Sequence, residues 1–467
     1  MLNLIWFRND LRLADNPALN YAMQEGKKTV ALFIIHPSQH EHHGEGPAKL
    51  EFFKAHVLDL VERLKKLGVR SIVKTLPWFD DVAAYLTQLV ETESFKSIFW
   101  NRSYWFNELQ RDQQVTTALQ SLGIKVNAYH SNYLLPPGSV KKGDGSMYHV
   151  FTPYKNKFIE IMKANYALPL PIPRGVVHKN SDDSNSKLID HQFNNDNFPA
   201  DLIDMWPIGE VAAAARLKAF VQHNDYHQER DFPAIAGTSS VSPYLAIGVI
   251  SANQCLAYML KADGESAFHS TWVAELIWRD FYNDLMSEYP RLAKHQTFKP
   301  QAVDHWHHNP ELFKKWQEGQ TGFPIVDAGM RQLLQEGWMH NRVRMIVASF
   351  LSKLCLIDWR LGEAHFMAHL LDGDLASNNG GWQWSSATGC DAAPYFRIFN
   401  PTTQSKKFDH EGIYIKKYVP ELNELEGKEI HDPAAETRQR CSYPEPAIDY
   451  KAARTGALSW YKDNPLA

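Results

Sequence analysis

The sequence predicts an α/β N-terminal domain with a parallel, Rossmann-like sheet, followed by a large all-α C-terminal domain. Three observations carry this prediction. Short apolar runs alternate with amphipathic stretches early in the chain, apolar residues recur at helical spacing in its second half, and a proline-rich, polar stretch separates the two. With 467 residues the chain is too long for one core. We therefore expect domains over 1–130 and 206–467, joined by a linker over 131–205.

Five apolar runs in the first part have the length and composition of buried strands. They span 2–7, 29–35, 71–76, 97–100 and 125–130. Between them, residues 49–68 carry apolar side chains at helical spacing and end at a glycine, which predicts a helix. Such alternation builds a parallel sheet with right-handed crossovers. No GxGxxG motif follows the first strand, so we expect no dinucleotide in the usual Rossmann position.

The pattern of the second part of the chain, from about residue 206, predicts helices. Segments 270–290, 324–359 and 362–374 are long and apolar on broad faces, and strand patterns are sparse. The preceding stretch holds LLPPG, LPLPIPRG and NSDDSNSK, which favours a linker that crosses the surface. A helical pattern over 148–165 lies inside that linker.

The bulk composition limits the classes of function. The net charge is -4 and the pI is near 6.6, so the chain has no global basic field for nucleic acid, although a local basic patch remains possible. The four cysteines are scattered, which indicates neither a zinc site nor a disulfide framework and fits the reducing cytoplasm. Charges at positions 8, 10 and 12 argue against a signal peptide, and no apolar run reaches the ~18 residues of a membrane span.

Residues 372–401 combine acidic, glycine and aromatic positions in one run. Trp382 and Trp384 follow an Asn-Asn-Gly-Gly sequence, which we expect to form a tight turn, and Asp372 and Asp374 precede it. The tryptophans are either core filler or flat faces for stacking. The same two alternatives hold for the 14 tryptophans of the whole chain.

Three further segments could carry chemistry. The hydroxyls of GTSSVSPYLAIG (237–248) either cap a helix or, with its N-terminus, form an anion site. In ELIWRDFY (275–282), Glu275, Trp278, Arg279 and Tyr282 fall on one helix face or two adjoining ones; the alternative is a buried Glu–Arg pair beside a core tryptophan.

The third segment is GWMHNRVRM (337–345), which carries two arginines on different helix faces. One of Arg342 and Arg344 can reach a phosphate while the other pairs with a carboxylate such as Asp372. The alternative is a solvated basic face.

These segments occur in order, together with TGFPIVDAGMRQL, DGDLASNNGGWQW and DAAPYFRIFNP. The combination closely resembles the photolyase/cryptochrome family and, more narrowly, its class I bacterial members that repair cyclobutane pyrimidine dimers. WFRNDLRLADNPAL near the N-terminus also matches. The resemblance covers nearly the whole chain and is densest from 271 to 411.

The resemblance implies that the helical domain binds FAD in its reduced form. The residues implied in binding it are Tyr226, Thr238, Ser239, Ser242, Trp272, Arg279, Arg344, Asp372, Asp374 and Asn378. Asn378 would face the flavin N5, where a neutral amide accepts a hydrogen bond from a fully reduced flavin. The family usually has Arg-Leu where this chain has Ser240 and Val241, so the contact of that arginine is missing here.

The implied substrate is UV-damaged DNA, duplex or single-stranded, with the dimer flipped into a pocket. The implied pocket residues are Glu275, Trp278, Asn341, Met345 and Trp384, and the phosphate-contact candidates are Arg230, Arg342, Arg397, Lys406 and Lys407. Photolyases for the six-four photoproduct carry histidines at the positions of Asn341 and Met345, which favours the cyclobutane substrate. Excited reduced flavin would donate an electron, the ring would split, and the electron would return.

The resemblance also implies an electron supply and an antenna. Trp382, Trp359 and Trp306 match the photoreduction chain of the family, in order from flavin to surface. His43, Asn107, Glu108 and Lys294 match the contacts of a methenyltetrahydrofolate antenna, with a deazaflavin as the alternative. We expect a monomer that repairs DNA, and a cryptochrome-like blue-light receptor is the alternative. The pocket residues, Asn378 and the lack of a long tail after the folded part favour repair.

Overall fold

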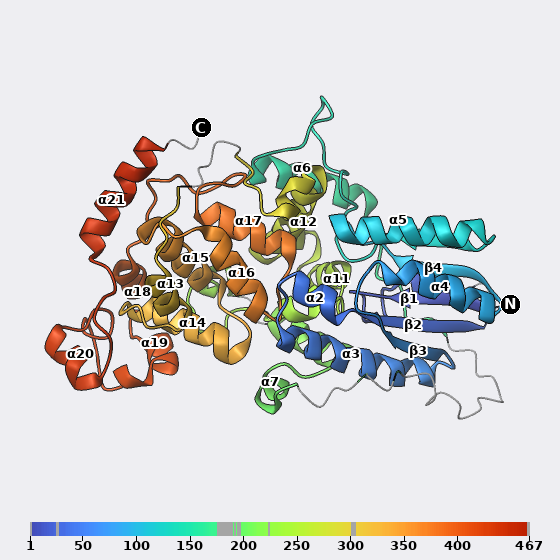
Figure 1. The fold of residues 1–467 in the computed structure, drawn as a ribbon, viewed down its shortest axis with the longest axis horizontal. Helices are drawn as coiled ribbons and strands as arrows, with labels where there is room; N and C mark the ends of the chain where they lie inside the picture. Colours follow the sequence, from blue (N-terminus) through green and yellow to red (C-terminus); the bar gives the residue numbers. More distant parts are fainter. Residues whose placement is uncertain are drawn as a thin grey trace. The chain divides into compact units, whose positions relative to one another are not determined.

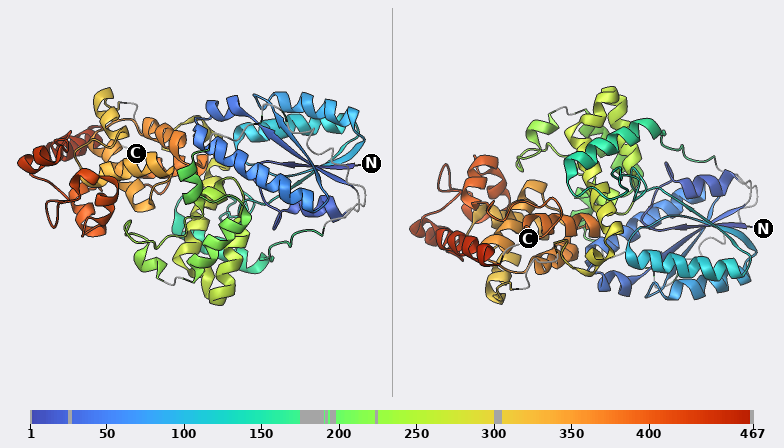
Figure 2. Two further views of the ribbon diagram at one scale, coloured as in Figure 1. Left: turned by 90° about the horizontal axis from the view of Figure 1, so that it is seen from below. Right: turned by 90° about the horizontal axis from the view of Figure 1, so that it is seen from above.

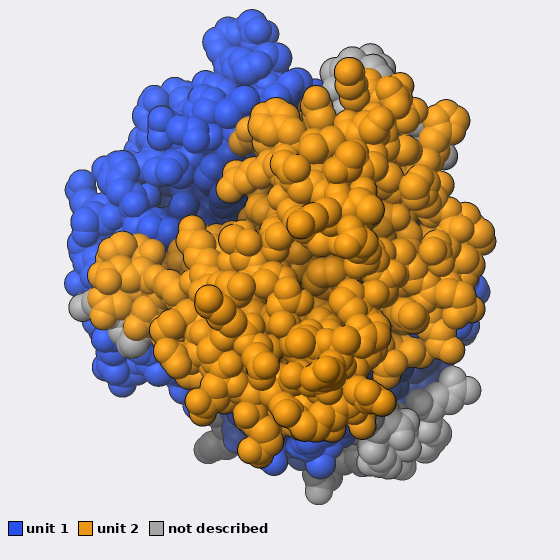
Figure 3. All heavy atoms as spheres, turned by 90° about the vertical axis from the view of Figure 1, so that its left-hand side faces the viewer, with its two compact units in different colours: residues 1–222, 239–290 blue, residues 223–238, 291–467 orange. Residues whose placement is uncertain are grey.

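The computed structural model describes residues 2–24, 28–174, 190, 193, 198–222, 225–299 and 305–464. The chain forms two compact units, shown in different colours in Figure 3. Unit 1 comprises residues 1–222 and 239–290, and unit 2 comprises residues 223–238 and 291–467. These bounds differ from the domain bounds expected from the sequence, because the helices up to residue 290 are grouped with the sheet.

Unit 1 contains the predicted parallel sheet. Its strands are β1 (Leu2–Phe7), β2 (Thr29–Ile35), β3 (Arg70–Thr75), β4 (Phe95–Asn101) and β5 (Lys125–Tyr129). All neighbours pair in parallel in the order β3-β2-β1-β4-β5 (Figure 1). Every residue of β2 is buried, as expected for a strand covered on both faces. The α/β fold class and all five strand positions are thereby confirmed.

Helices cover both faces of this sheet. The helices next to it are α1 (Pro17–Gln24), α2 (Pro37–His42), α3 (Pro47–Lys66), α4 (Asp81–Thr92) and α5 (Phe106–Ser121). Figure 2 shows α4 and α5 on one face and α3 on the other. Alternate residues of β1, Leu4 and Trp6, pack with Val82 and Leu86 of α4. The predicted helix over 49–68 is confirmed as α3, and the chain leaves it through Gly68 at φ +76°.

The remaining helices of unit 1 are α6 (Phe151–Asn165), α7 (Ala200–Met205), α8 (Glu210–Val221), α10 (Ser242–Ala246), α11 (Ala252–Asp263) and α12 (Thr271–Glu288). The stretch expected to be a surface linker is anchored to α12 in its first part. The amides of Leu135 and Gly138 donate to Asp280 and Asp284 at 3.0 and 2.8 Å, and the Tyr154 hydroxyl of α6 donates to Asp284 at 2.8 Å.

Unit 2 is helical in the part of the chain that the structure describes. Its helices are α9 (Tyr226–Glu229), α13 (Pro310–Gln317), α14 (Pro324–Glu336), α15 (Asn341–Ser349), a π-helical turn (Phe350–Leu354), α16 (Trp359–His369), α17 (Leu375–Ser385), α18 (Pro401–Phe408), α19 (Ile413–Tyr418), α20 (Ala435–Cys441) and α21 (Tyr450–Asp463). One large apolar core joins α14, α15 and α16 and contains Trp316, Trp359 and Trp382. The expected all-α architecture is confirmed for these residues.

The turn expected at Asn-Asn-Gly-Gly is wrong, because these residues lie inside α17. Asp374 caps the helix by accepting from the amide of Ser377 at 2.9 Å. This cap and the packing of Trp382 on α16 outweigh the ~1 kcal/mol that each glycine costs in a helix. Both tryptophans of the segment are therefore helical residues, two positions apart. Across the described ranges, no helix combines the length and apolar content needed to cross a membrane.

Candidate functional sites

An ion pair joins α15 to the segment before α17. The Arg344 guanidinium donates to both carboxylate oxygens of Asp372, at 3.0 and 2.8 Å, and to the carbonyl oxygen of Met339 at 2.8 Å. One guanidinium nitrogen contacts the carboxylate while Nε binds the backbone, so the arginine is held at two points. The expected pairing of Arg344 with Asp372 is confirmed. Asn341 and Met345 lie on the same helix, one turn apart and therefore on one face.

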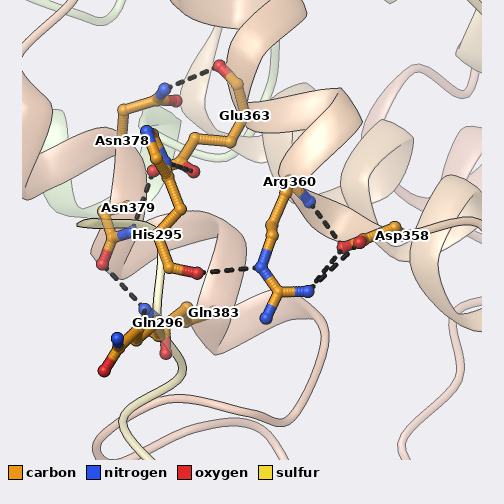
Figure 4. A network of polar contacts seen from close by, with 8 residues as sticks. All are labelled: His295, Gln296, Asp358, Arg360, Glu363, Asn378, Asn379 and Gln383. Carbon is orange, nitrogen blue, oxygen red and sulfur yellow. Dashed lines mark hydrogen bonds and ion pairs between the residues drawn. The ribbon is translucent and has the colours of Figure 1, made fainter. Parts of the chain in front are cut away.

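Asn378 is held in one orientation by the neighbouring helix. Its amide nitrogen donates to the backbone carbonyl of Glu363 at 2.9 Å (Figure 4). A carbonyl can only accept, so the donor must be the nitrogen and the other polar atom of Asn378 is the acceptor oxygen. The side chain is buried with 9% exposure. The structure thus presents a single, oriented acceptor at this position.

Glu363, whose backbone carbonyl holds Asn378, is itself held by a chain of side-chain hydrogen bonds (Figure 4). The Glu363 carboxylate, 1% exposed, accepts from Asn379 at 2.9 Å and contacts the His295 ring nitrogen at 3.0 Å. Asn379 in turn accepts from Gln383 at 2.8 Å. The hydrogen bond to Glu363 raises the pKa of His295 and favours its charged form. Sequence reasoning missed this network; the only local signal was the spacing of Asn379 and Gln383 by one helical turn.

These residues fit a flavin. The edge of a flavin ring carries N–H donors and carbonyl acceptors, and Asp372, Asp374 and Asn378 are buried polar groups at 9%, 8% and 9% exposure. Buried carboxylates need partners. Asp372 has Arg344, and Asp374 has the amide of Ser377. The acceptor oxygen of Asn378 is available for an N–H donor, as reduced flavin N5 would offer.

The segment 237–248, expected to form an anion site, shows few of the contacts that such a site needs. Ser239 accepts from the indole nitrogen of Trp272 at 3.2 Å, so these two predicted residues lie together. Ser242 begins α10, which has only five residues and so offers a weak dipole. Ser240, the position that departs from the family, has a left-handed backbone at φ +48°. Arg279 donates to the carbonyl of Asn132 at 2.7 Å.

Tyr226 and Thr238 belong to unit 2, as do the predicted cofactor residues Arg344, Asp372, Asp374 and Asn378. Tyr226 lies under Arg230, whose guanidinium carbon is 5.5 Å from the ring centroid. Thr238 is half-buried.

Trp278 has a stacking partner that the sequence did not point to. The ring of Phe151, at the start of α6, lies 3.6 Å from that of Trp278 with planes 8° apart. Tyr282, one turn further along α12, packs against the same indole at 5.4 Å. Trp278 is therefore fixed in plane, and Glu275 lies on the same helix one turn before it. In unit 2, Trp384 is half-buried on α17.

Two of the three predicted electron-transfer tryptophans are core residues. Trp359 and Trp382 are 0% and 2% exposed. Trp382 packs directly on α16, since a Cβ at Gly362 would lie 2.1 Å from its ring. Trp306 is half-buried against the same core. Its neighbour His307 donates its amide to the Leu356 carbonyl at 2.7 Å, which brings this segment to within a few residues of Trp359.

The phosphate-contact candidates differ in their surroundings. Arg342 forms an ion pair with Asp231 at 2.8 Å and lies 4.4 Å over the ring of Phe408. Arg397, Lys406 and Lys407 are exposed, and Arg230 is half-buried. Lys353, which the sequence did not single out, is buried and donates to the carbonyl oxygens of Pro394 and Arg397 at 3.0 and 3.2 Å. Burial lowers its pKa to about 7.

Of the predicted antenna residues of unit 1, His43 and Asn107 are in direct contact. The side-chain amides of Asn107 and Gln39 both lie 2.9 Å from the Nε2 atom of His43. Burial lowers the pKa of His43 to about 4, so the ring is neutral at pH 7. Burial raises the pKa of Glu108 on the same α5. Gln39 was missed by sequence reasoning. Lys294 ends the 3-10 turn Pro290–Lys294 and belongs to unit 2.

No cluster of three or more metal-ligating side chains occurs in the described residues. The sites consist of oriented amides, paired carboxylates and aromatic rings, which are groups suited to holding a flat organic molecule in one orientation.

Comparisons with known proteins agree on one family. Residues 3–174 match the sequence profile of DNA photolyase, and residues 272–463 match that of the FAD binding domain of DNA photolyase. A deoxyribodipyrimidine photo-lyase of Escherichia coli K12 is 41% identical, over 98% of this chain and 98% of its own.

Two solved structures are similar over the whole length. The class III photolyase of Agrobacterium tumefaciens has a TM-score of 0.86 and 34% identity, covering 100% of this chain and 98% of its own. The cryptochrome of Synechocystis sp. PCC6803 has a TM-score of 0.83 and 28% identity, covering 98% and 99%.

Proposed function

Because the chain belongs to the DNA photolyase family, we propose that it binds reduced FAD and uses light to split cyclobutane pyrimidine dimers in DNA, acting as a monomeric carbon–carbon lyase. The observation that carries the proposal is Asn378, a buried amide whose nitrogen is bound to the Glu363 carbonyl and whose oxygen is left to accept. An acceptor suits an N–H at flavin N5, which the reduced ring carries.

The flavin, when bound, would supply the light-driven electron that opens the cyclobutane ring and is afterwards recovered. The rest of the work falls to the protein. Asp372, held by Arg344, and Asp374 would accept from polar groups of the cofactor. Ser239, Ser242 and Thr238 would bind its pyrophosphate, with Tyr226, Trp272 and Arg279 nearby. The roles of Asp372 and Asp374 are supported by resemblance and by the buried, partnered state of their carboxylates, and the other roles are supported by resemblance.

The lesion would be bound by Glu275, Trp278, Asn341, Met345 and Trp384. Indole faces suit the two pyrimidine rings, and the carboxyl and amide suit the base edges. The absence of histidine at positions 341 and 345 supports the cyclobutane dimer over the six-four photoproduct. Arg230, Arg342, Arg397, Lys406 and Lys407 would contact backbone phosphates, which position the duplex without reading sequence.

Trp382, Trp359 and Trp306 would pass electrons inward to restore the reduced cofactor. Burial of the first two excludes water and keeps their positions fixed. His43, Asn107, Glu108 and Lys294 would bind an antenna, methenyltetrahydrofolate in preference to a deazaflavin. The neutral His43 ring, which contacts the side-chain amides of Asn107 and Gln39, supports a ligand that needs polar contacts and no positive charge at this position.

The test is repair itself. Purified protein with chemically reduced FAD is mixed with DNA containing cyclobutane dimers and exposed to blue or near-UV light. We expect dimers to be lost only in the light, and the spectrum of the released chromophores to identify the antenna. Binding of reduced FAD without loss of dimers would exclude the repair enzyme and favour a light receptor, as in the cryptochrome of similar fold.

A further inference from the structure

The aromatic contacts of Trp306 continue into the C-terminal helix. Trp460 of α21 faces Trp306 with ring centroids 5.2 Å apart and planes 32° apart. Trp306 packs against the large helical core, and Trp460 packs against a small cluster formed by Leu356, Ala457 and Tyr461. The His307 amide bond to Leu356 ties the first ring to that cluster as well. The indole pair is therefore held from both sides.

A paired indole lowers the energy of a positive charge on its neighbour. The face of an aromatic ring is negative, and a cation over it is attracted by about 1 kcal/mol at a partly exposed site. Both rings are half-buried, so the charge also remains partly solvated. An electron vacancy on Trp306 is consequently more stable when Trp460 can share or accept it.

The next aromatic residue is a poor acceptor of that vacancy. Tyr461 lies against Trp460 at 4.9 Å, but it is 1% exposed and its hydroxyl donates to the backbone carbonyl of Ser386 at 3.1 Å. Oxidation of a tyrosine requires loss of its hydroxyl proton, and a backbone carbonyl is a very weak base. Burial also raises the pKa of Tyr461. The vacancy therefore stops at Trp460.

We infer that Trp460 is the terminal electron donor of the tryptophan chain. One electron passes from Trp460 to oxidised Trp306, which becomes neutral again. Trp460 is left as a radical cation and releases its indole N–H proton to water. A small-molecule thiol then returns one electron and one proton and is itself left as a thiyl radical. The inference rests on the proposed function, in which Trp382, Trp359 and Trp306 precede this step.

The experiment is laser-flash transient absorption on protein with oxidised flavin, which records the decay of the tryptophan radical. In Trp460→Phe we expect the radical to recombine about fivefold faster, which corresponds to about 1 kcal/mol of lost stabilisation. A decay identical to that of the unchanged protein overturns the inference.

A second variant separates this inference from the function beneath it. Trp306→Phe must remove the long-lived radical altogether. If it does not, the proposed chain is wrong; if it does while Trp460→Phe has no effect, only the terminal role of Trp460 is wrong.

A readout that needs no photochemistry tests the pair directly. Two neighbouring indoles give an exciton couplet in circular dichroism, so the difference spectra of Trp306→Phe and of Trp460→Phe against the unchanged protein must show the same couplet. The contributions of the other close pairs, Trp6–Trp100 and Trp316–Trp382, cancel in these differences. Tyr450→Phe, in the first turn of α21, is the matched control and must give no couplet in its difference spectrum. A difference spectrum of Trp460→Phe without a couplet contradicts the pairing. Should Trp460→Phe not fold, Trp460→Met fills the same space with a flexible apolar chain and takes its place in both measurements, with the same expected results.

Discussion

At the scale of single residues, Phe151 fixes the orientation of the Trp278 ring. One face of the indole is covered by the phenyl ring at 3.6 Å, and Tyr282 borders it at 5.4 Å. A tryptophan proposed to stack on a damaged base must hold its plane before the base arrives, because ordering it on binding would cost affinity. Phe151 supplies that order from a different helix.

Replacing this ring with an aliphatic side chain tests the role. In Phe151→Leu the site stays apolar but loses the stacked pair, worth about 0.5–1.5 kcal/mol. We expect affinity for dimer-containing DNA to fall by up to about tenfold, measured by fluorescence anisotropy, with affinity for undamaged DNA unchanged. Phe158→Leu, a buried change on the same helix, is the control and must leave the ratio of the two affinities as it was.

At the scale of elements, α16 and α17 pack closely because one helix has a glycine at the contact. Gly362 allows the Trp382 ring to lie directly on the α16 backbone, and the neighbouring Glu363 carbonyl holds Asn378. Close approach of this kind is available only where no Cβ intervenes. The two helices therefore have one packing arrangement, which sets the ring and the amide together.

Two glycine-to-alanine changes should have opposite effects. Gly362→Ala places a methyl group 2.1 Å from the Trp382 ring, so we expect a loss of about 1–3 kcal/mol in unfolding free energy and slower flavin photoreduction. Gly381→Ala on α17 meets nothing within 4 Å and removes a helix-breaking residue, so we expect a gain of about 1 kcal/mol. Urea unfolding measures both. Equal effects of the two changes would contradict the close packing.

At the scale of the whole molecule, buried carboxylates attach long connections to the core of their own unit. In unit 1, Asp280 and Asp284 hold the amides of Leu135 and Gly138. Burial raises the pKa of Asp280 to about 8 and that of Asp284 to about 6. Both groups thus bind protons in the folded state at pH values where the unfolded chain has released them.

This difference predicts a loss of stability with rising pH. The contribution of each raised pKa is complete below the unfolded value near 4 and is lost as the pH rises through about 6 for Asp284 and about 8 for Asp280. Urea unfolding between pH 5 and 9 should therefore show a decline that Asp280→Asn flattens in its upper part. Asp263→Asn, at an exposed position, should leave the decline unchanged. A decline equally steep in Asp280→Asn would contradict the assignment.

Local sequence patterns predicted most helices and strands, but few of the contacts between residues distant in the sequence. The five strands were recognisable because each is a short, mainly apolar run between amphipathic stretches, and the Arg344–Asp372 pair because both residues stand in recognisable motifs. Asn378–Gln383 was misread because glycines suggested a turn, while the cap at Asp374 and the packing on α16 stabilise a helix. The contacts of Phe151 and Glu363 join residues distant in sequence, which no periodicity records.

The Asn378–Glu363 bond has an evolutionary consequence. Trp359, Gly362 and Glu363 lie within about one turn of α16. The proposed electron supply through Trp359 and the proposed contact of Asn378 with flavin N5, which Glu363 orients, therefore depend on the same short stretch of backbone. A substitution that shifts this turn alters both traits at once. Relatives in which one of these two properties has changed should therefore also differ in the other. Second-site mutations that compensate for a mutation in α16 should arise on the side of α17 that faces it.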